Sequence, residues 1–168
     1  MVAERLKALD VEVYACDPFV SEETAKELNV TLVDMETLFR ECDVISNHLA
    51  NKPELENVFN RKLFKLMKKR STFINTGRGA QVAEYQLALS LILHPSRTFV
   101  ADVLKREFFP YINPLFWCPN AILTPHIAGS MGKEPQRMAY YMMEEMEKML
   151  AGEPVKYEVT LESLERMA

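Results

Sequence analysis

Short apolar strands alternate with helical segments along the chain, and this alternation limits the fold more than any other feature. The strand-like runs are rich in β-branched and aromatic residues, and most are followed by a segment whose apolar residues recur at helical spacing. Parallel strands need crossover connections, which helices commonly supply. We therefore predict an α/β fold with a doubly wound parallel sheet that is covered by helices on both faces.

The expected elements have definable limits. Strands are predicted at residues 11–16, 31–33, 43–47, 72–75, 98–102 and 121–123. Helices are predicted at residues 2–9, 61–67, 84–93 and 133–150, with two more that start after Ser21 and Asp34. Ser21 and Asp34 have side chains that suit N-caps, and Asn60 precedes the helix at residues 61–67. Asp17-Pro18 ends the first predicted strand.

Two of these helices have a side that we expect to be buried. In residues 84–93, Leu87, Leu91 and the adjacent leucines are expected to face inward. Residues 133–150 carry methionines on one side and end at Gly152, a suitable C-cap. Because methionine fills irregular gaps, we expect this stripe to face a core against a sheet or a second subunit. Its members are Met138, Met142, Met146 and Met149.

Composition argues against several kinds of partner. The 168 residues carry a formal net charge of -4, so no basic excess is available for nucleic-acid phosphates or an anionic membrane. No apolar run approaches the length of a membrane span. The three cysteines are widely spaced without a C-x-x-C pair, which argues against a disulfide framework or zinc site and fits a reducing cytoplasm. We expect one domain over residues 1–150 and a C-terminal tail over residues 151–168.

Glycine is scarce, and its positions are informative. The chain has five glycines, and Gly77, Gly79, Gly129 and Gly132 follow predicted strands. Ligands of α/β sheets bind outside the carboxyl ends of the strands, where glycine lets the backbone approach closely. These four glycines therefore predict a binding edge. No G-x-G-x-x-G phosphate loop occurs, because no glycine precedes Gly77.

Three loops at this edge, taken in order, carry a resemblance to a known family. They are Asn75-Thr76-Gly77-Arg78-Gly79, Ala101-Asp102-Val103 followed by Glu107, and Leu123-Thr124-Pro125-His126-Ile127-Ala128-Gly129. Together they resemble motifs of the D-isomer-specific 2-hydroxyacid dehydrogenases, in the family's order and spacing. The similarity extends over residues 1–150 and includes Asp17-Pro18, Ser46-Asn47-His48-Leu49, residues 62–68 and Pro119-Asn120.

The resemblance implies a catalytic set of three side chains. In that family an imidazole exchanges the hydroxyl proton while hydride moves between NAD and C2 of the substrate. The imidazole would be that of His126, and Glu107 would fix its tautomer and favour its protonated form. Arg78 would bind the substrate carboxylate and polarise the carbonyl. Any one of the three, taken alone, could be an ordinary loop residue.

The resemblance also implies NAD-contacting residues. Asp17 would accept the hydroxyls of the adenosine ribose and repel the 2′-phosphate of NADP, although it could instead be a turn residue before Pro18. Thr76 and Gly77 would line the nicotinamide side, and Asp102 would accept from the carboxamide. His48 would meet the cofactor or serve as a packing residue. Gly129 completes the implied cofactor set. No metal is expected, because the three histidines lie far apart in the sequence.

Two positions depart from the family pattern. Ala83 stands where an acidic residue is usual, and Phe108 stands where proline usually follows the catalytic glutamate. The substrate domain, the first strand and the glycine-rich loop of the family would all precede Met1. We therefore expect an N-terminally truncated Rossmann-like domain whose sheet lacks its central strand.

These observations leave two hypotheses about function. The first is the NAD-binding, catalytic-residue-bearing part of an oxidoreductase that acts on a D-2-hydroxy acid or 2-oxo acid and is inactive as this chain alone. The second is a catalytically silent binding or dimerisation module that retains the fold. Unpaired strand edges at residues 11–16 and 43–47 favour a homodimer, because pairing between chains would satisfy them.

Overall fold

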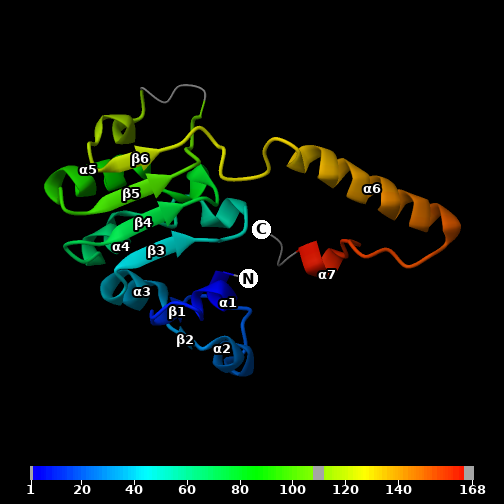
Figure 1. The fold of residues 1–168 in the computed structure, drawn as a ribbon. Coiled ribbons are helices and arrows are strands. Elements are labelled where there is room, and N and C mark those ends of the chain that lie inside the picture. Colours follow the sequence, from blue (N-terminus) through cyan, green and yellow to red (C-terminus); the bar gives the residue numbers. More distant parts are fainter. Residues whose placement is uncertain (1, 108–111, 165–168) are drawn as a thin grey trace.

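The computed structural model describes residues 2–107 and 112–164, which form an α/β body and a projecting helix (Figure 1). The strands are β1 (Val13–Ala15), β2 (Val30–Leu32), β3 (Val44–Asn47), β4 (Thr72–Asn75), β5 (Thr98–Ala101) and β6 (Ala121–Leu123). The helices are α1 (Val2–Leu6), α2 (Glu22–Leu28), α3 (Met35–Glu41), α4 (Arg61–Leu66), α5 (Glu84–Leu93), α6 (Glu134–Ala151) and α7 (Leu161–Leu164). Short 3-10 turns are η1 (Pro53–Leu55), η2 (Gly79–Gln81) and η4 (Pro114–Trp117).

The strands form two parallel sheets. One has four strands in the order β3-β4-β5-β6, and the other pairs β1 with β2. Figure 1 draws β1 and β2, with α1 and α2, as a group below the larger sheet. The α/β class and the parallel strands are confirmed, with β2 lying one residue earlier than expected. Within the described residues β1 and β3 each pair on one side alone, so the sheet is divided between them.

Side-chain caps set several helix starts. Oγ of Ser21 accepts from the backbone N–H of Thr24 at 3.2 Å, and Oδ1 of Asp34 accepts from that of Thr37 at 2.7 Å. Oδ1 of Asn60 accepts from the N–H of Lys62 at 2.9 Å. Each contact satisfies a donor that the first helical turn leaves free, so the predicted starts of α2, α3 and α4 are confirmed.

Aromatic packing fills the core beneath the four-stranded sheet. The ring of Phe73, on β4, lies at the centre, with centroid distances of 5.1 Å to Phe59 and 5.5 Å to Phe99. Phe39 and Phe64 add rings at 5.8 and 6.1 Å from Phe73. All five rings are tilted against their neighbours and buried, an arrangement that favours both apolar burial and ring quadrupoles.

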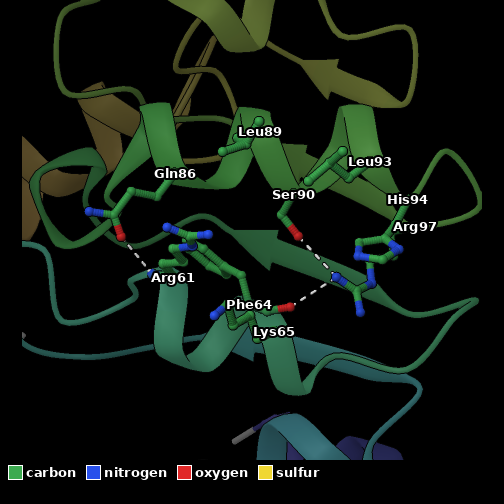
Figure 2. A pocket seen from close by; sticks show the side chains of 9 residues that line it. All are labelled: Arg61, Phe64, Lys65, Gln86, Leu89, Ser90, Leu93, His94 and Arg97. Carbon is green, nitrogen blue, oxygen red and sulfur yellow. Dashed lines mark hydrogen bonds between the residues drawn. The ribbon is translucent and has the colours of Figure 1, made fainter.

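A buried arginine holds α4 against α5. The Arg97 guanidinium contacts the backbone oxygens of Phe64, Met67 and Lys68 and the Oγ of Ser90. Figure 2 shows the contacts with Phe64 and Ser90. Three of the four acceptors belong to the last turn of α4 or follow it directly, where carbonyls lack helical partners and the helix dipole favours a cation. Burial lowers the pKa of Arg97 from its ordinary value. Arg97 therefore acts as a tertiary C-cap for α4.

The expectation about the buried face of α5 is met in part, and the packing of the α6 methionines against the sheet is wrong, while their packing against a second subunit stays a prediction. Leu87 and Leu91 of α5 are buried, but the adjacent Leu89 and Leu93 are exposed and line a pocket beside α4 (Figure 2). The methionine stripe of α6 is also exposed, with Met142 56% accessible. Figure 1 shows the reason: α6 projects away from the sheet instead of covering it.

The contacts of α6 come from the segment that follows it. Glu145, its one buried residue in the described part, accepts the backbone N–H groups of Lys156 and Tyr157 at 2.6 and 2.8 Å. Gly152 ends the helix in the left-handed region, at φ 71°, as the predicted C-cap. Within residues 2–107 and 112–164 no helix is long and apolar enough to cross a membrane.

Candidate active site

The loop after β4 carries the predicted anion-binding arginine. Oδ1 of Asn75, the last residue of β4, accepts from the N–H of Gly77 at 3.1 Å, and its Nδ2 donates to the carbonyl of Arg78 at 3.2 Å. One buried amide thus shapes the whole turn. The Arg78 side chain is exposed, and its Nη1 donates to the carbonyl of Gly77 at 2.8 Å. This contact leaves other guanidinium N–H groups able to bind a ligand.

The loop after β5 is fixed by a buried carboxylate. Glu84, the first residue of α5, accepts from the N–H of Lys105 at 2.8 Å and from Nδ2 of Asn113 at 2.7 Å. It therefore binds both sides of the segment that contains Glu107. Burial raises the pKa of Glu84, although both hydrogen bonds act in the opposite direction. Gly79 permits this packing, because a Cβ there would overlap the backbone of Leu104 and Lys105.

Asp102 anchors the loop that contains the candidate imidazole. Its carboxylate accepts from the backbone N–H groups of Ile127 and Ala128, each at 2.8 Å, and from the hydroxyl of Thr124. Its own carbonyl accepts from the N–H of His126 at 3.0 Å. Burial would raise the pKa of Asp102, but the bonds from Thr124 and the two backbone N–H groups outweigh it, and the pKa is lowered.

This anchoring supports an unusual backbone at His126. The residue has φ 55°, in the left-handed region that non-glycine residues seldom occupy. Such a conformation costs about 1 to 3 kcal/mol and persists where surrounding contacts determine it. Here Asp102 contacts His126 and both following residues. The loop therefore aims the imidazole at the expense of local backbone energy.

Glu107 and His126 form the predicted contact. Nδ1 of His126 lies 3.1 Å from Oε2 of Glu107, and the two side chains are 54% and 40% exposed. With the carboxylate on Nδ1, the opposite ring nitrogen, Nε2, faces away from Glu107 and is open to a reacting group. Arg78 follows β4, the strand beside β5, so all three side chains come from the carboxyl edge of one sheet.

The predicted cofactor residues occupy several separate loops. Asp17 is exposed just beyond β1, and its Oδ1 accepts from the N–H of Phe19 at 2.9 Å, which is the turn contact foreseen as its alternative role. His48 is exposed beyond β3, with Nε2 2.9 Å from Oγ of Ser46. Thr76 and Gly129 are exposed in the loops after β4 and β6. Asp17 belongs to the smaller sheet, whereas the other residues follow strands of the larger one.

Sequence reasoning missed three residues that organise this edge, and also Arg97 at the opposite, amino end of the strands. The three are Asn47, Gln81 and Glu84, and all four are buried and hydrogen-bonded. The sequence holds a signal for Asn47 and Gln81. One amide ends a strand that starts with apolar residues, and the other lies in the run Ala80-Gln81-Val82. A polar side chain in such a run suggests a satisfied buried network. Phe108, where a departure was noted, lies outside the described residues.

Comparisons with known proteins identify the family. The model of the D-isomer specific 2-hydroxyacid dehydrogenase, NAD binding domain, matches residues 1–128. A D-3-phosphoglycerate dehydrogenase of Archaeoglobus fulgidus is 35% identical over 164 residues, which are 98% of this chain and 31% of that protein. A putative 2-hydroxyacid dehydrogenase of Staphylococcus haemolyticus is 31% identical over 93% of this chain and 49% of its own length.

Solved structures agree with this assignment. The NAD complex of a D-isomer specific 2-hydroxyacid dehydrogenase from Lactobacillus delbrueckii ssp. bulgaricus has a TM-score of 0.82 at 26% identity, over 95% of this chain and 51% of that one. D-lactate dehydrogenase with NAD+ from Lactobacillus jensenii gives 0.81 at 27% identity, over 95% and 51%. The chain thus spans about a third to a half of the relatives it matches. It belongs to the D-isomer specific 2-hydroxyacid dehydrogenase family, as an NAD-binding domain.

Proposed function

We propose that this chain is the NAD-binding and catalytic-residue-bearing part of an oxidoreductase that transfers hydride between NAD and a D-2-hydroxy acid or its 2-oxo acid. The observation that carries the proposal is the 3.1 Å contact between Nδ1 of His126 and Oε2 of Glu107, on a loop anchored by Asp102. An imidazole whose far nitrogen is open and whose near nitrogen is held by a carboxylate is suited to exchange a proton with a substrate oxygen.

The roles of the three side chains follow from their chemistry. His126 donates a proton from Nε2 to the oxygen at C2 when a 2-oxo acid is reduced, and takes it back when the hydroxy acid is oxidised. Glu107 fixes the tautomer and stabilises the imidazolium. Arg78 binds the substrate carboxylate through its forked donors. NAD, when bound, supplies or accepts the hydride.

The donor and acceptor groups suit two parts of the dinucleotide. Oδ2 of Asp17 has no partner within the described residues, so it can accept a ribose hydroxyl while Oδ1 keeps its turn contact. Near the nicotinamide end we assign Thr76, Gly77 and Asp102, with His48 and Gly129 at the edges of the site. Glycine at position 77 lets the backbone pack against Asn47, because a Cβ there would lie 2.8 Å from its Nδ2.

The pyrophosphate has no such match. The chain contains no G-x-G-x-x-G turn, and the strands that would flank one, β1 and β3, lie in different sheets. Backbone N–H groups at a helix start are the usual holders of this group. We therefore propose weak dinucleotide binding and no normal rate of turnover by this chain alone. The same observation favours the second candidate function, a catalytically silent binding or dimerisation module.

We also propose a domain division, an assembly and a location for this chain. We assign residues 1–150 to the NAD-binding domain and residues 151–168 to a tail. A homodimer is supported by the unpaired edges of β1 and β3 and by the exposed methionines of α6. Cysteines that are all free fit a reducing cytoplasm.

Calorimetric titration with NAD+ and NADP+ tests the cofactor assignment. We expect NAD+ to bind more tightly than NADP+, and Asp17→Asn to remove this preference, because the amide keeps the turn contact and lacks the charge. Asp34→Asn is the matched control, because it removes the same charge from the N-cap of α3, after β2, and it should keep the preference for NAD+. Tighter binding of NADP+ would contradict the assignment, and no binding of NAD+ at millimolar concentration would favour the silent module.

Turnover separates the remaining alternatives. NADH oxidation is followed with pyruvate, glyoxylate and hydroxypyruvate. Ordinary enzymes turn over about 1 to 1000 times per second, and we expect the rate of this chain to lie far below that range. A normal rate that is abolished by His126→Asn would establish the chemistry and refute the proposed inactivity of the chain alone.

A further inference from the structure

Three buried amides form a hydrogen-bonded network between the ends of β3 and β4. Asn47, Asn75 and Gln81 are each 2% exposed or less. Nδ2 of Asn47 donates to Oδ1 of Asn75 at 2.9 Å and to Oε1 of Gln81 at 2.7 Å. One amide nitrogen therefore joins the last residue of β3, the last residue of β4 and the turn η2.

The network extends into both neighbouring loops. Toward the loop after β3, Oδ1 of Asn47 accepts from the N–H of Leu49 at 3.0 Å, and Nε2 of Gln81 donates to the carbonyl of Ala50 at 2.7 Å. Toward the loop after β4, the contacts of Asn75 with Gly77 and Arg78 already described define the turn. The two loops are thus connected near the strand ends through side chains, in addition to the backbone hydrogen bonds that Asn57 and Phe59 make farther along with Ala80 and Gln81.

The fit of the network is tight. A Cβ at Gly77 would lie 2.8 Å from Nδ2 of Asn47, closer than side chains pack in proteins. Among the described residues no buried side-chain nitrogen or oxygen lacks a partner. Apolar residues could fill the same volume, but they would leave the buried N–H and C=O groups of the two loops unpaired. A fully satisfied polar network fixes one geometry where apolar packing would allow several.

We propose that Asn47, Gln81 and Asn75 are positioning residues, which set the turn that presents Arg78 relative to the loop that presents His48. The effect on ligand binding rests on the proposed function of Arg78, whereas the coupling between the two loops does not depend on that function. Asn47 and Gln81 touch the backbone of these loops and not the reacting groups, so they act through Arg78 and its neighbours.

Gln81→Met tests the network directly, because it keeps the length of the side chain and removes the amide. Gln86→Met is the matched control, since Oε1 of Gln86 accepts from the N–H of Arg61 at 2.6 Å, outside the network. Amide hydrogen exchange is measured by NMR at Gly77 and Leu49, with Leu87 in the core as the reference. The affinity for oxamate is measured in the presence of NADH, alongside the affinity for NADH itself.

We expect Gln81→Met to raise exchange at Gly77 and Leu49 about tenfold, while exchange at Leu87 stays unchanged, and Gln86→Met to alter none of the three. A tenfold change corresponds to about 1.4 kcal/mol. We also expect oxamate affinity to fall by a similar factor, and NADH affinity to fall as well, because Gly77 and His48 lie on the two loosened loops. If Gln81→Met does not fold, Asn47→Ala carries the same expectations.

The outcomes separate the two parts of the argument. An unchanged exchange rate at Gly77, or an equal rise at all three amides, overturns the positioning role, because the network would then contribute general stability alone. Local loosening with unchanged oxamate affinity overturns the link to Arg78. If the unaltered protein does not bind oxamate, the proposed function of Arg78 fails, and the exchange measurement still decides whether the loops are coupled.

Discussion

Replacing Asp102 by asparagine should loosen the loop that presents His126. The asparagine side chain has the same shape and keeps one oxygen acceptor, but an NH2 donor replaces the second carboxylate oxygen. In the native protein Oδ1 accepts from Thr124 and Ile127, and Oδ2 accepts from Ala128. Whichever way the amide is turned, a donor faces a donor on one side. At least one charge-assisted hydrogen bond is lost, and the others are weakened.

The expected cost follows from these contacts. A hydrogen bond to a charged group contributes about 1.5 to 3 kcal/mol, so the loss of one and the weakening of the others predicts about 2 to 3 kcal/mol. For a chain of this length that lowers the melting temperature by roughly 4 to 12 °C. The lowered pKa of Asp102 adds a pH dependence. Its stabilisation is complete above the unfolded pKa of about 3.9 and is lost as the pH falls through the folded pKa.

Urea unfolding of the variant at pH 7 and at lower pH measures both effects. Asp43→Asn is the control, because Oδ1 of Asp43 meets Nζ of Lys68 at 3.1 Å in an exposed pair, which should contribute less than about 1 kcal/mol. We expect Asp102→Asn to cost clearly more than the control at pH 7, with a difference that shrinks below pH of about 4. Equal costs for the two variants would refute the anchoring role of Asp102.

Three further outcomes are expected from contacts elsewhere. Gly77→Ala should destabilise by about 1 to 3 kcal/mol because its Cβ meets Asn47, and a double-mutant cycle with Asn47→Ala should recover part of that cost; additive costs would contradict the contact. Arg97→Met should cost about 3 kcal/mol or more in urea unfolding, because carbonyls at the end of α4 lose their donor; a cost under 1 kcal/mol would contradict the capping role. Because the pKa of Glu84 is raised, the folded protein binds more protons there than the unfolded chain, so the contribution of Glu84 to stability falls as the pH rises from about 4.3 through the folded pKa. Glu84→Gln should remove this pH dependence of the free energy of unfolding, and an unchanged pH dependence would contradict burial of the charge.

The sequence was most informative where local chemistry decides the structure. The capping oxygens of Ser21 and Asp34 and the apolar runs of β4 and β6 depend on a few neighbouring residues, and these elements were predicted within a residue or so. The contact between Glu107 and His126 was also expected, but through family resemblance and not through spacing. Residues 19 positions apart have no local reason to meet.

Other features depend on tertiary packing that a sequence pattern does not specify. The methionines of α6 have the spacing of a buried face, yet Met142 is exposed, because the pattern does not say whether a partner surface is present. Likewise, Gln81 and Glu84 are buried polar residues whose partners lie 21 to 34 positions away. The left-handed backbone of His126 depends on Asp102 in the same way.

A crystal structure with NADH and oxamate tests the central claim most directly. We predict that the oxamate carboxylate contacts the Arg78 guanidinium, that its carbonyl oxygen lies within hydrogen-bond distance of Nε2 of His126, and that Glu107 remains on Nδ1. This arrangement would place substrate binding and proton exchange on the side chains assigned to them. Oxamate bound at another surface, or bound here with His126 and Arg78 both out of reach, would contradict the account.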